Sequence, residues 1–171
     1  VPASIANSSG IFLDPAAHLD IVRPGAALYG VNPTPAKPNP MKPVVELKAR
    51  IAQVRSVEFG ETVGYDATWT ARRPSRIAVV TMGYADGFFR SASGSDQKPG
   101  GTLIVAGRPC PIVGRISMDL IALDITDLPN GSVRRGDFAT VIGEGRDVDA
   151  LGEMLGTIGY EVLTSLGRRY R

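Results

Sequence analysis

Short runs of aliphatic and β-branched residues recur between residues 45 and 142, each bounded by turn-forming residues. Residues 45–51 alternate strictly between apolar and polar side chains, which is typical of a half-buried antiparallel strand. The alternation slips near Gln53, which predicts a β-bulge. The further runs are 76–82, 102–106, 111–116, 120–125 and 138–142, with segments rich in Gly, Pro, Asp and Asn between them. This pattern predicts a mainly β fold, an antiparallel β-barrel or sandwich.

The end of the chain has a helical pattern. After Gly145 a helix is expected to run to Leu155, with Asp147 or Asp149 as its N-cap. A second helix is predicted over residues 159–166, with its apolar side chains on one face. The β domain therefore ends in short helices.

The first 40 residues differ in character. Short apolar runs at 5–10 and 21–30 flank a helix-sized gap, which is a βα pattern. Parallel strands need both faces covered, and the chain starts with Val1 rather than Met, so we expect the end of a larger α/β structure. Residues 32–43 carry five prolines and indicate a linker. The predicted division is the end of an α/β barrel plus linker over 1–40 and a β domain over 41–171.

Composition argues against several classes of function. The formal charge of +2 is too small to favour nucleic-acid binding, and no apolar run approaches the ~20 residues of a membrane span. The single cysteine, Cys110, forms neither an internal disulfide nor a cysteine-rich zinc site, which favours a reduced, cytosolic compartment. No metal site is expected. One cysteine and one histidine, His18, also argue against a hydrolase triad.

Four dense clusters of Gly, Tyr, Asp and Arg resist a purely structural explanation. They cover residues 64–66, 83–87, 114–119 and 158–161, and three of the five tyrosines in the chain directly follow a glycine. Glycine frees the backbone at strand ends, where loops position functional groups. From the residues alone, each tyrosine is still more often a packed side chain than a catalytic one.

The same clusters carry a resemblance. Residues 22–30 (VRPGAALYG) are similar to the last barrel strand of alanine racemases, and residues 63–69 (VGYDATW) resemble that family's catalytic-tyrosine segment. Residues 83–87, 112–119 and 160–161 follow in the family's order. Each motif alone has low specificity, but five in order, spanning nearly the whole chain, are specific.

The resemblance implies a two-part enzyme in which an upstream TIM-type barrel holds pyridoxal 5'-phosphate on a lysine. It implies a cytoplasmic homodimer with shared active sites that interconverts L- and D-alanine and supplies D-alanine for cell-wall peptidoglycan. The family's lysine lies upstream and is absent here, so the chain alone is expected to be inactive. Ser4 stands where many members carry a histidine, which bears on the orientation of Arg23.

The resemblance also implies roles in the reaction. Tyr65 would be one of two bases on opposite faces of the substrate Cα, with the upstream lysine as the other. Arg23 would face the pyridine nitrogen of the cofactor. The backbone amide of Met118 would bind the substrate carboxylate, and Tyr84 would narrow the pocket to suit alanine. The phosphate would be held by Ser8, the backbone amides of Gly25 and Ala26, and Tyr160.

Two other interpretations stay open. One is another barrel-type pyridoxal-phosphate enzyme, such as an amino-acid decarboxylase. That class depends on a cysteine- and aspartate-based substrate site, where this chain has Ser117 and Tyr65. The other is a stand-alone β-barrel binding module, which would need no upstream sequence. The barrel-like segment at residues 20–30 argues against it.

Overall fold

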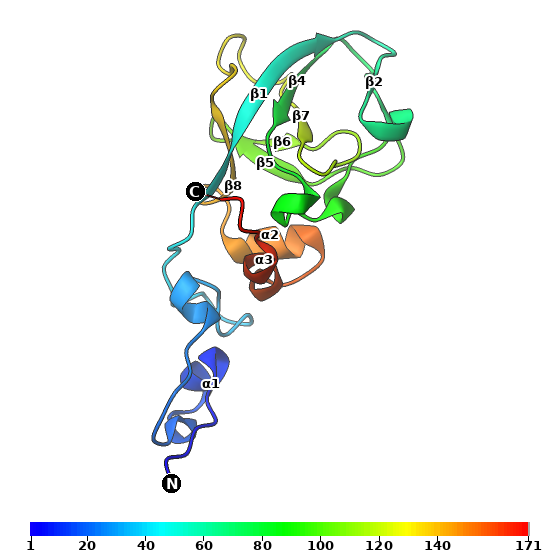
Figure 1. Ribbon diagram of the computed structural model, residues 1–171. Helices are drawn as coiled ribbons and strands as arrows, with labels where there is room; N and C mark the ends of the chain where they lie inside the picture. Colours follow the sequence, from blue (N-terminus) through cyan, green and yellow to red (C-terminus); the bar gives the residue numbers. More distant parts are fainter. Residues whose placement is uncertain (171) are drawn as a thin grey trace. The chain divides into compact units, whose positions relative to one another are not determined.

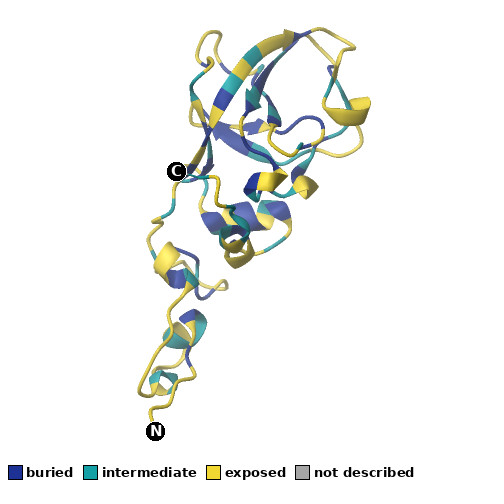
Figure 2. Ribbon diagram, viewed as in Figure 1, coloured by how far each residue is buried: buried dark blue, intermediate teal, exposed yellow. Residues whose placement is uncertain are grey.

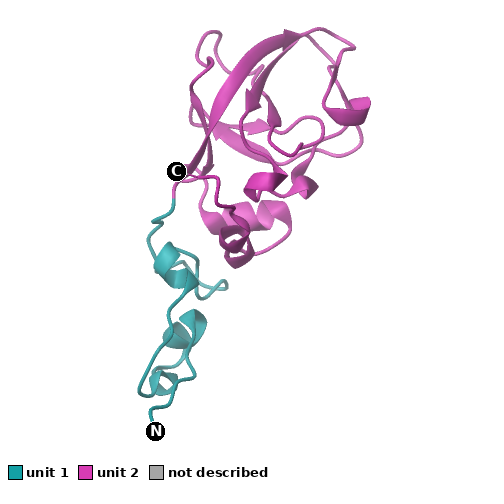
Figure 3. Ribbon diagram, in the orientation of Figure 1, with its two compact units in different colours: residues 1–45 teal, residues 46–171 magenta. Residues whose placement is uncertain are grey.

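The computed structural model describes residues 1–170. They form two compact units, residues 1–45 and residues 46–171 (Figure 3). Among the described residues, the second unit holds all the strands and two of the α-helices. None of the helices among residues 1–170 combines the length and the apolar character needed to cross a bilayer.

A six-stranded antiparallel sheet dominates the second unit (Figure 1). Its order is β6 (Arg108–Pro111), β5 (Thr102–Val105), β8 (Phe138–Ile142), β1 (Leu47–Val57), β4 (Ser75–Val80) and β7 (Ile121–Asp124). An antiparallel bridge between Ile112 and Leu123 joins the two ends of this order, so the sheet nearly closes into a barrel. A separate pair, β2 (Thr62–Val63) and β3 (Trp69–Thr70), lies outside the sheet. The predicted antiparallel β class is confirmed.

Strand β1 is long because it serves two partners. Its first half pairs with β8 and its second half with β4. The register shifts between Ile51 and Gln53, which confirms the predicted bulge and allows the strand to bend from one partner to the other. Leu47, Ala49 and Ile51 are buried and the residues between them exposed, as the alternation predicted.

One predicted strand is largely wrong. Residues 111–116 contribute only Pro111, which ends β6, and the isolated bridge at Ile112. The chain then leaves the sheet at Gly114, whose φ of +71° is a left-handed conformation. The preceding strand, β6, was not predicted because it contains Pro109 and Pro111, which are tolerated at this position only because β6 ends the sheet order.

Aliphatic side chains of β1, β4, β5, β7 and β8 form the core of the barrel. Figure 2 colours the buried stretches of the ribbon dark blue. The largest fully buried side chains include Ile51, Ile77, Leu103, Ile121 and Leu123. Each contributes about 1.5–3 kcal/mol on burial. Cys110 is buried as well, and burial, with the negative charge of Asp124, raises the pKa of its thiol. This cysteine is therefore a core residue.

Two helices follow the sheet. Helix α2 (Val148–Leu155) is capped by Asp147, whose carboxylate accepts from the Ala150 amide at 2.8 Å. Gly156, with φ +78°, ends it. Helix α3 spans Gly159–Ser165, one residue shorter than predicted. Of the two caps that the sequence left open, Asp147 is the one observed, and the predicted end at Leu155 is confirmed.

The first unit contains helix α1 (Ser8–Leu13) and two short 3₁₀ helices, η1 (Pro15–His18) and η2 (Ala26–Tyr29). The strands predicted at residues 5–10 and 21–30 are not formed, and only one parallel bridge, between Asn7 and Arg23, is observed there. Residues 5–10 were predicted as a strand, but a helix begins at Ser8. The Asn7 side chain caps this helix by accepting from the Gly10 amide at 3.0 Å.

Candidate active site

Tyr65 stands on a loop between β2 and β3. It begins the 3₁₀ helix η3 (Tyr65–Ala67), and it is 68% exposed. Gly64 has φ +83°, and a Cβ there would lie 3.0 Å from the Arg115 amide nitrogen. Only glycine lets this loop lie so close to the segment at Gly114.

The backbone directly after Tyr65 is strained. Asp66 and Ala67 have φ of +60° and +49°, a region that residues other than glycine rarely adopt. The Arg115 guanidinium pairs with the Asp66 carboxylate at 2.9 Å and holds this conformation from outside. Strain that is maintained by neighbouring contacts occurs preferentially at functional sites.

The far end of the same loop is tied by Asp96. Its carboxylate accepts from the Thr70 amide at 3.0 Å and from the Thr70 hydroxyl at 2.9 Å, and its own amide donates to Thr68. The two hydrogen bonds from Thr70 lower the pKa of Asp96, because they stabilise its charged form. The loop that carries Tyr65 is therefore fixed at both ends.

Two further turns lie directly against each other. The Tyr84 amide donates to the Ser117 carbonyl at 3.1 Å, and the Ala85 amide donates to the Met118 carbonyl at 3.0 Å. Gly83 makes this approach possible, since a Cβ there would lie 2.3 Å from the Ser117 oxygen. Within residues 1–170 the Met118 amide itself donates no hydrogen bond, and the Met118 side chain is half exposed.

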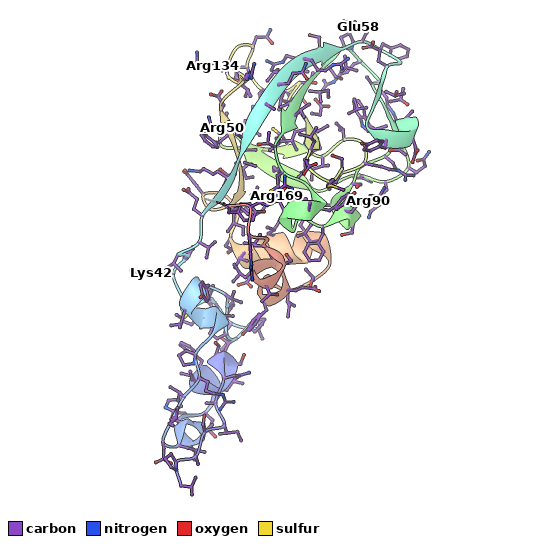
Figure 4. All side chains as sticks on the ribbon, in the orientation of Figure 1. Lys42, Arg50, Glu58, Arg90, Arg134 and Arg169 are labelled. Atoms are coloured by element: carbon purple, nitrogen blue, oxygen red, sulfur yellow. The ribbon has the colours of Figure 1, made fainter. Side chains whose placement is uncertain are left out.

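These loops and turns enclose a pocket of about 650 Å³. It is lined by Tyr65, Tyr84, Arg90, Ile116, Ser117 and Met118. Tyr65, Tyr84 and Met118, which sequence analysis singled out separately, thus share one pocket. Arg90, labelled in Figure 4, was missed because it follows Phe88 and Phe89 in no recognisable motif.

Of the predicted phosphate-binding residues in the first unit, Ser8 and Gly25 meet, and Ala26 lies between the two residues whose amides contact Ser8. The buried hydroxyl of Ser8 accepts from the amides of Gly25 at 2.9 Å and Ala27 at 3.3 Å. The parallel bridge between Asn7 and Arg23 aligns the two segments that carry these groups.

Arg23 and Tyr160 have different surroundings. The Arg23 guanidinium donates a hydrogen bond to the Ser4 hydroxyl, so the residue that replaces the family's histidine contacts this arginine directly. Tyr160 lies in the first turn of α3, in the second unit, and its side chain is partly exposed. Their roles toward a cofactor stay predictions.

The fold is that of a nearly closed β-barrel domain with a pocket lined by two tyrosines, preceded by a unit of short helices whose segments are joined by one parallel bridge. Residues 44–171 match the family model described as alanine racemase, C-terminal domain, and residues 1–33 match the alanine racemase N-terminal domain. The chain belongs to the alanine racemase family.

Individual relatives agree. Alanine racemase of Methylobacterium sp. (strain 4-46) is 56% identical over 98% of this chain and 44% of its own length. A catabolic alanine racemase of Mesorhizobium japonicum is 49% identical over 99% of this chain and 42% of its own length. The chain thus spans less than half the length of these relatives.

Solved structures show the same relationship. Alanine racemase from Bartonella henselae, with covalently bound pyridoxal phosphate, superposes with a TM-score of 0.90 at 44% identity, covering 99% of this chain and 46% of that one. Alanine racemase from Bacillus anthracis, with bound L-Ala-P, gives a TM-score of 0.85 at 30% identity, covering 97% of this chain and 42% of that one.

Proposed function

We propose that this chain is the C-terminal part of a pyridoxal-phosphate-dependent alanine racemase, which interconverts L- and D-alanine by proton transfer at Cα with two bases. The observation that carries the proposal is the pocket shared by Tyr65, Tyr84 and Met118. The three residues come from separate loops, and the family resemblance implies a role at the reacting substrate for each. The biological role of the D-alanine would be cell-wall peptidoglycan synthesis.

The first unit has groups that fit a phosphate. The Ser8 hydroxyl accepts from the Gly25 amide, whereas the Ala26 amide donates no hydrogen bond within residues 1–170. The space beside Gly25 is open, because a Cβ there would meet no atom within 4 Å. Hydroxyl and backbone N–H groups are common ligands of phosphate. We assign the phosphate of pyridoxal 5'-phosphate to Ser8, the amides of Gly25 and Ala26, and Tyr160. The bound pyridoxal phosphate in the Bartonella henselae relative supports this cofactor as the ligand.

Arg23 would contact the pyridine nitrogen. A guanidinium stays protonated at any ordinary pH, so it donates a hydrogen bond and no proton. When bound, the cofactor withdraws the electron pair that proton removal leaves at Cα. By leaving the ring nitrogen unprotonated, Arg23 would weaken this withdrawal and so favour prompt return of a proton to Cα, which is racemisation, over transamination.

Tyr65 would hold and move the proton on one face of Cα. Racemisation removes a proton from one face and returns one to the other, which two opposed bases achieve without turning the substrate. The exposed position of Tyr65 on its strained loop leaves the hydroxyl free to meet a substrate. Positioned acid–base groups typically contribute about 10²–10⁴-fold to the rate.

The two turns beside Tyr65 would bind the substrate. The Met118 amide, which has no acceptor within residues 1–170, would donate to the alanine carboxylate. Tyr84 would narrow the same pocket, so that a methyl group fits and larger side chains do not. A pocket can select one substrate by excluding larger ones. We therefore assign the specificity for alanine to Tyr84.

The alternatives have less support. Among decarboxylases of this architecture the resemblance leads us to expect a cysteine at the substrate site, but Cys110 is buried in β6 and is not among the pocket residues. A stand-alone binding module would not need the N-terminal domain that matches residues 1–33.

A chimera tests the proposal. Replacing the matching 44% of the Methylobacterium sp. alanine racemase by residues 1–171 is expected to give a protein that binds the cofactor and forms D-alanine from L-alanine. The 171-residue chain by itself is expected to do neither, since the cofactor lysine belongs to the upstream part. D-Alanine formation and the visible absorbance of bound cofactor are the measurements. A folded chimera without racemase activity would contradict the proposal, and an active isolated chain would contradict the division of roles.

A second test addresses the proposed dimer, in which Tyr65 and Met118 would serve the partner's cofactor while Ser8, Arg23 and Tyr160 serve their own. A Tyr65→Phe chimera is mixed with a chimera that lacks the cofactor lysine. Random exchange makes half of the dimers mixed, each with one intact site, so about a quarter of the normal activity should return. Each variant mixed with itself is the control. Persistent inactivity of the mixture, once mass spectrometry has shown mixed dimers, would rule out shared sites.

A further inference from the structure

The chain continues beyond α3 along the turn that carries Tyr84. Residues 165–170, the C-terminal strap, contact this turn repeatedly. The Ser165 hydroxyl, at the end of α3, lies 3.0 Å from the Gly87 carbonyl oxygen and 2.8 Å from the Val162 carbonyl oxygen, so its one hydrogen is shared between the two acceptors. The Gly167 amide donates to the Asp86 carbonyl at 3.2 Å. The Tyr170 hydroxyl donates to the same Asp86 carbonyl at 2.5 Å. Burial, with the nearby Asp86 charge, raises the pKa of Tyr170 to about 12, so this donor stays protonated.

Arg169 of the strap, labelled in Figure 4, contacts two turns at once. Its Nη1 lies 3.2 Å from a carboxylate oxygen of Asp86 and 2.7 Å from one of Asp119. Asp86 belongs to the turn of Tyr84, and Asp119 directly follows Met118. One guanidinium therefore joins the two turns that present the substrate-binding side of the pocket, although Arg169 is not among the residues that line it.

The two ion pairs differ in physical weight. Asp119 is half exposed, and an exposed ion pair adds little to stability because water screens it. The Asp86 side chain is only 10% exposed, and its other oxygen accepts from the Gly83 amide at 2.9 Å. A buried carboxylate without a cation is costly, so the loss of Arg169 would disturb the turn around Gly83 first.

We propose that Arg169 is a positioning residue, which holds the turns of Tyr84 and Met118 in register and thereby keeps the Met118 amide and the Tyr84 ring in place for the substrate. This inference rests on the proposed function. The two N–H groups of Nη1 can meet the two carboxylates together, and the rigid, planar guanidinium fixes their direction, whereas lysine offers a compact charge on a flexible stem.

The test compares Arg169→Gln with Arg168→Gln in the chimera. Arg168 is the matched control, because it is exposed and forms no ion pair within residues 1–170. Arg169→Gln is expected to raise KM for alanine about threefold to tenfold with a smaller change in kcat, because substrate placement loosens. It should also speed hydrogen–deuterium exchange at the Tyr84 and Ala85 amides, with the β8 peptide unchanged. Arg168→Gln should change neither readout.

Two further variants keep the test decisive. Arg169→Lys should restore the exchange rates only in part, and Asp119→Asn should add little to Arg169→Gln, since both remove the same link. Unchanged exchange and KM in Arg169→Gln would overturn the inference. So would faster exchange with unchanged KM, because the strap would then be structural only. If the parent chimera folds but does not racemise alanine, the proposed function fails, while the exchange comparison still decides whether Arg169 holds the turns.

Discussion

Replacing Tyr65 by alanine in the chimera is expected to slow proton abstraction from L-alanine by about 10²–10⁴-fold. Proton exchange at Cα of D-alanine should keep a larger fraction of its original rate. The asymmetry follows from the proposed roles: the family resemblance assigns the face of L-alanine to the tyrosine and the face of D-alanine to the lysine. Removing one base should damage chiefly the transfer on its own face.

Deuterium incorporation at Cα, measured separately from each enantiomer, distinguishes this role from simple packing. Tyr65→Phe keeps the ring and removes only the hydroxyl, so it should show the same asymmetry as Tyr65→Ala. If Tyr65 merely shapes the pocket, Tyr65→Phe would be nearly harmless, and Tyr65→Ala would slow both enantiomers together. That result would exclude Tyr65 as the second base, and Tyr84, which lines the same pocket, would be tested next.

Gly83→Ala is expected to have the next largest effect. The new Cβ would lie 2.3 Å from the Ser117 oxygen and 2.4 Å from the Met118 carbonyl, so the backbone of one turn must move. Overpacking of this kind costs about 1–3 kcal/mol of stability. This movement would also lengthen the two hydrogen bonds that the Tyr84 and Ala85 amides donate to the other turn. We therefore expect kcat/KM for alanine to fall about 10²-fold, which is the typical penalty of a small misplacement at a reacting site.

Gly131→Ala is the matched control. Its Cβ would meet no atom within 4 Å, but its φ of +76° makes alanine strained, at about 1–2 kcal/mol. Gly131 lies outside the pocket, so this variant should lose stability and keep its kcat/KM. Denaturant unfolding and steady-state kinetics on both variants separate the two effects. Normal kinetics in Gly83→Ala would mean that the contact between the turns does not position the substrate.

Much of the fold could be predicted from the sequence because the signals are local. Alternation over residues 45–51 reports a strand with one buried face, and the slip near Gln53 marks the bulge at which β1 changes partner. Asp147 marks the start of α2, because its carboxylate accepts a hydrogen bond from an amide in the first turn of the helix. The glycine–tyrosine clusters, taken in order, indicated the family that the comparisons show. The boundary between residues 40 and 41 stays a prediction.

Only the tertiary structure decided which of these segments meet. No local pattern relates Arg169 to Asp86 and Asp119, because ion pairs between distant segments leave no periodic trace in the sequence. Arg90 was likewise not predicted as a pocket residue, because its place beside the pocket depends on distant segments. β6 escaped prediction because its prolines are excluded from central strands and tolerated only where the sheet order ends. Periodicity and helix caps indicate the role of a residue within its own helix or strand. A functional site depends instead on the distances between elements, and the closure of the barrel sets those distances.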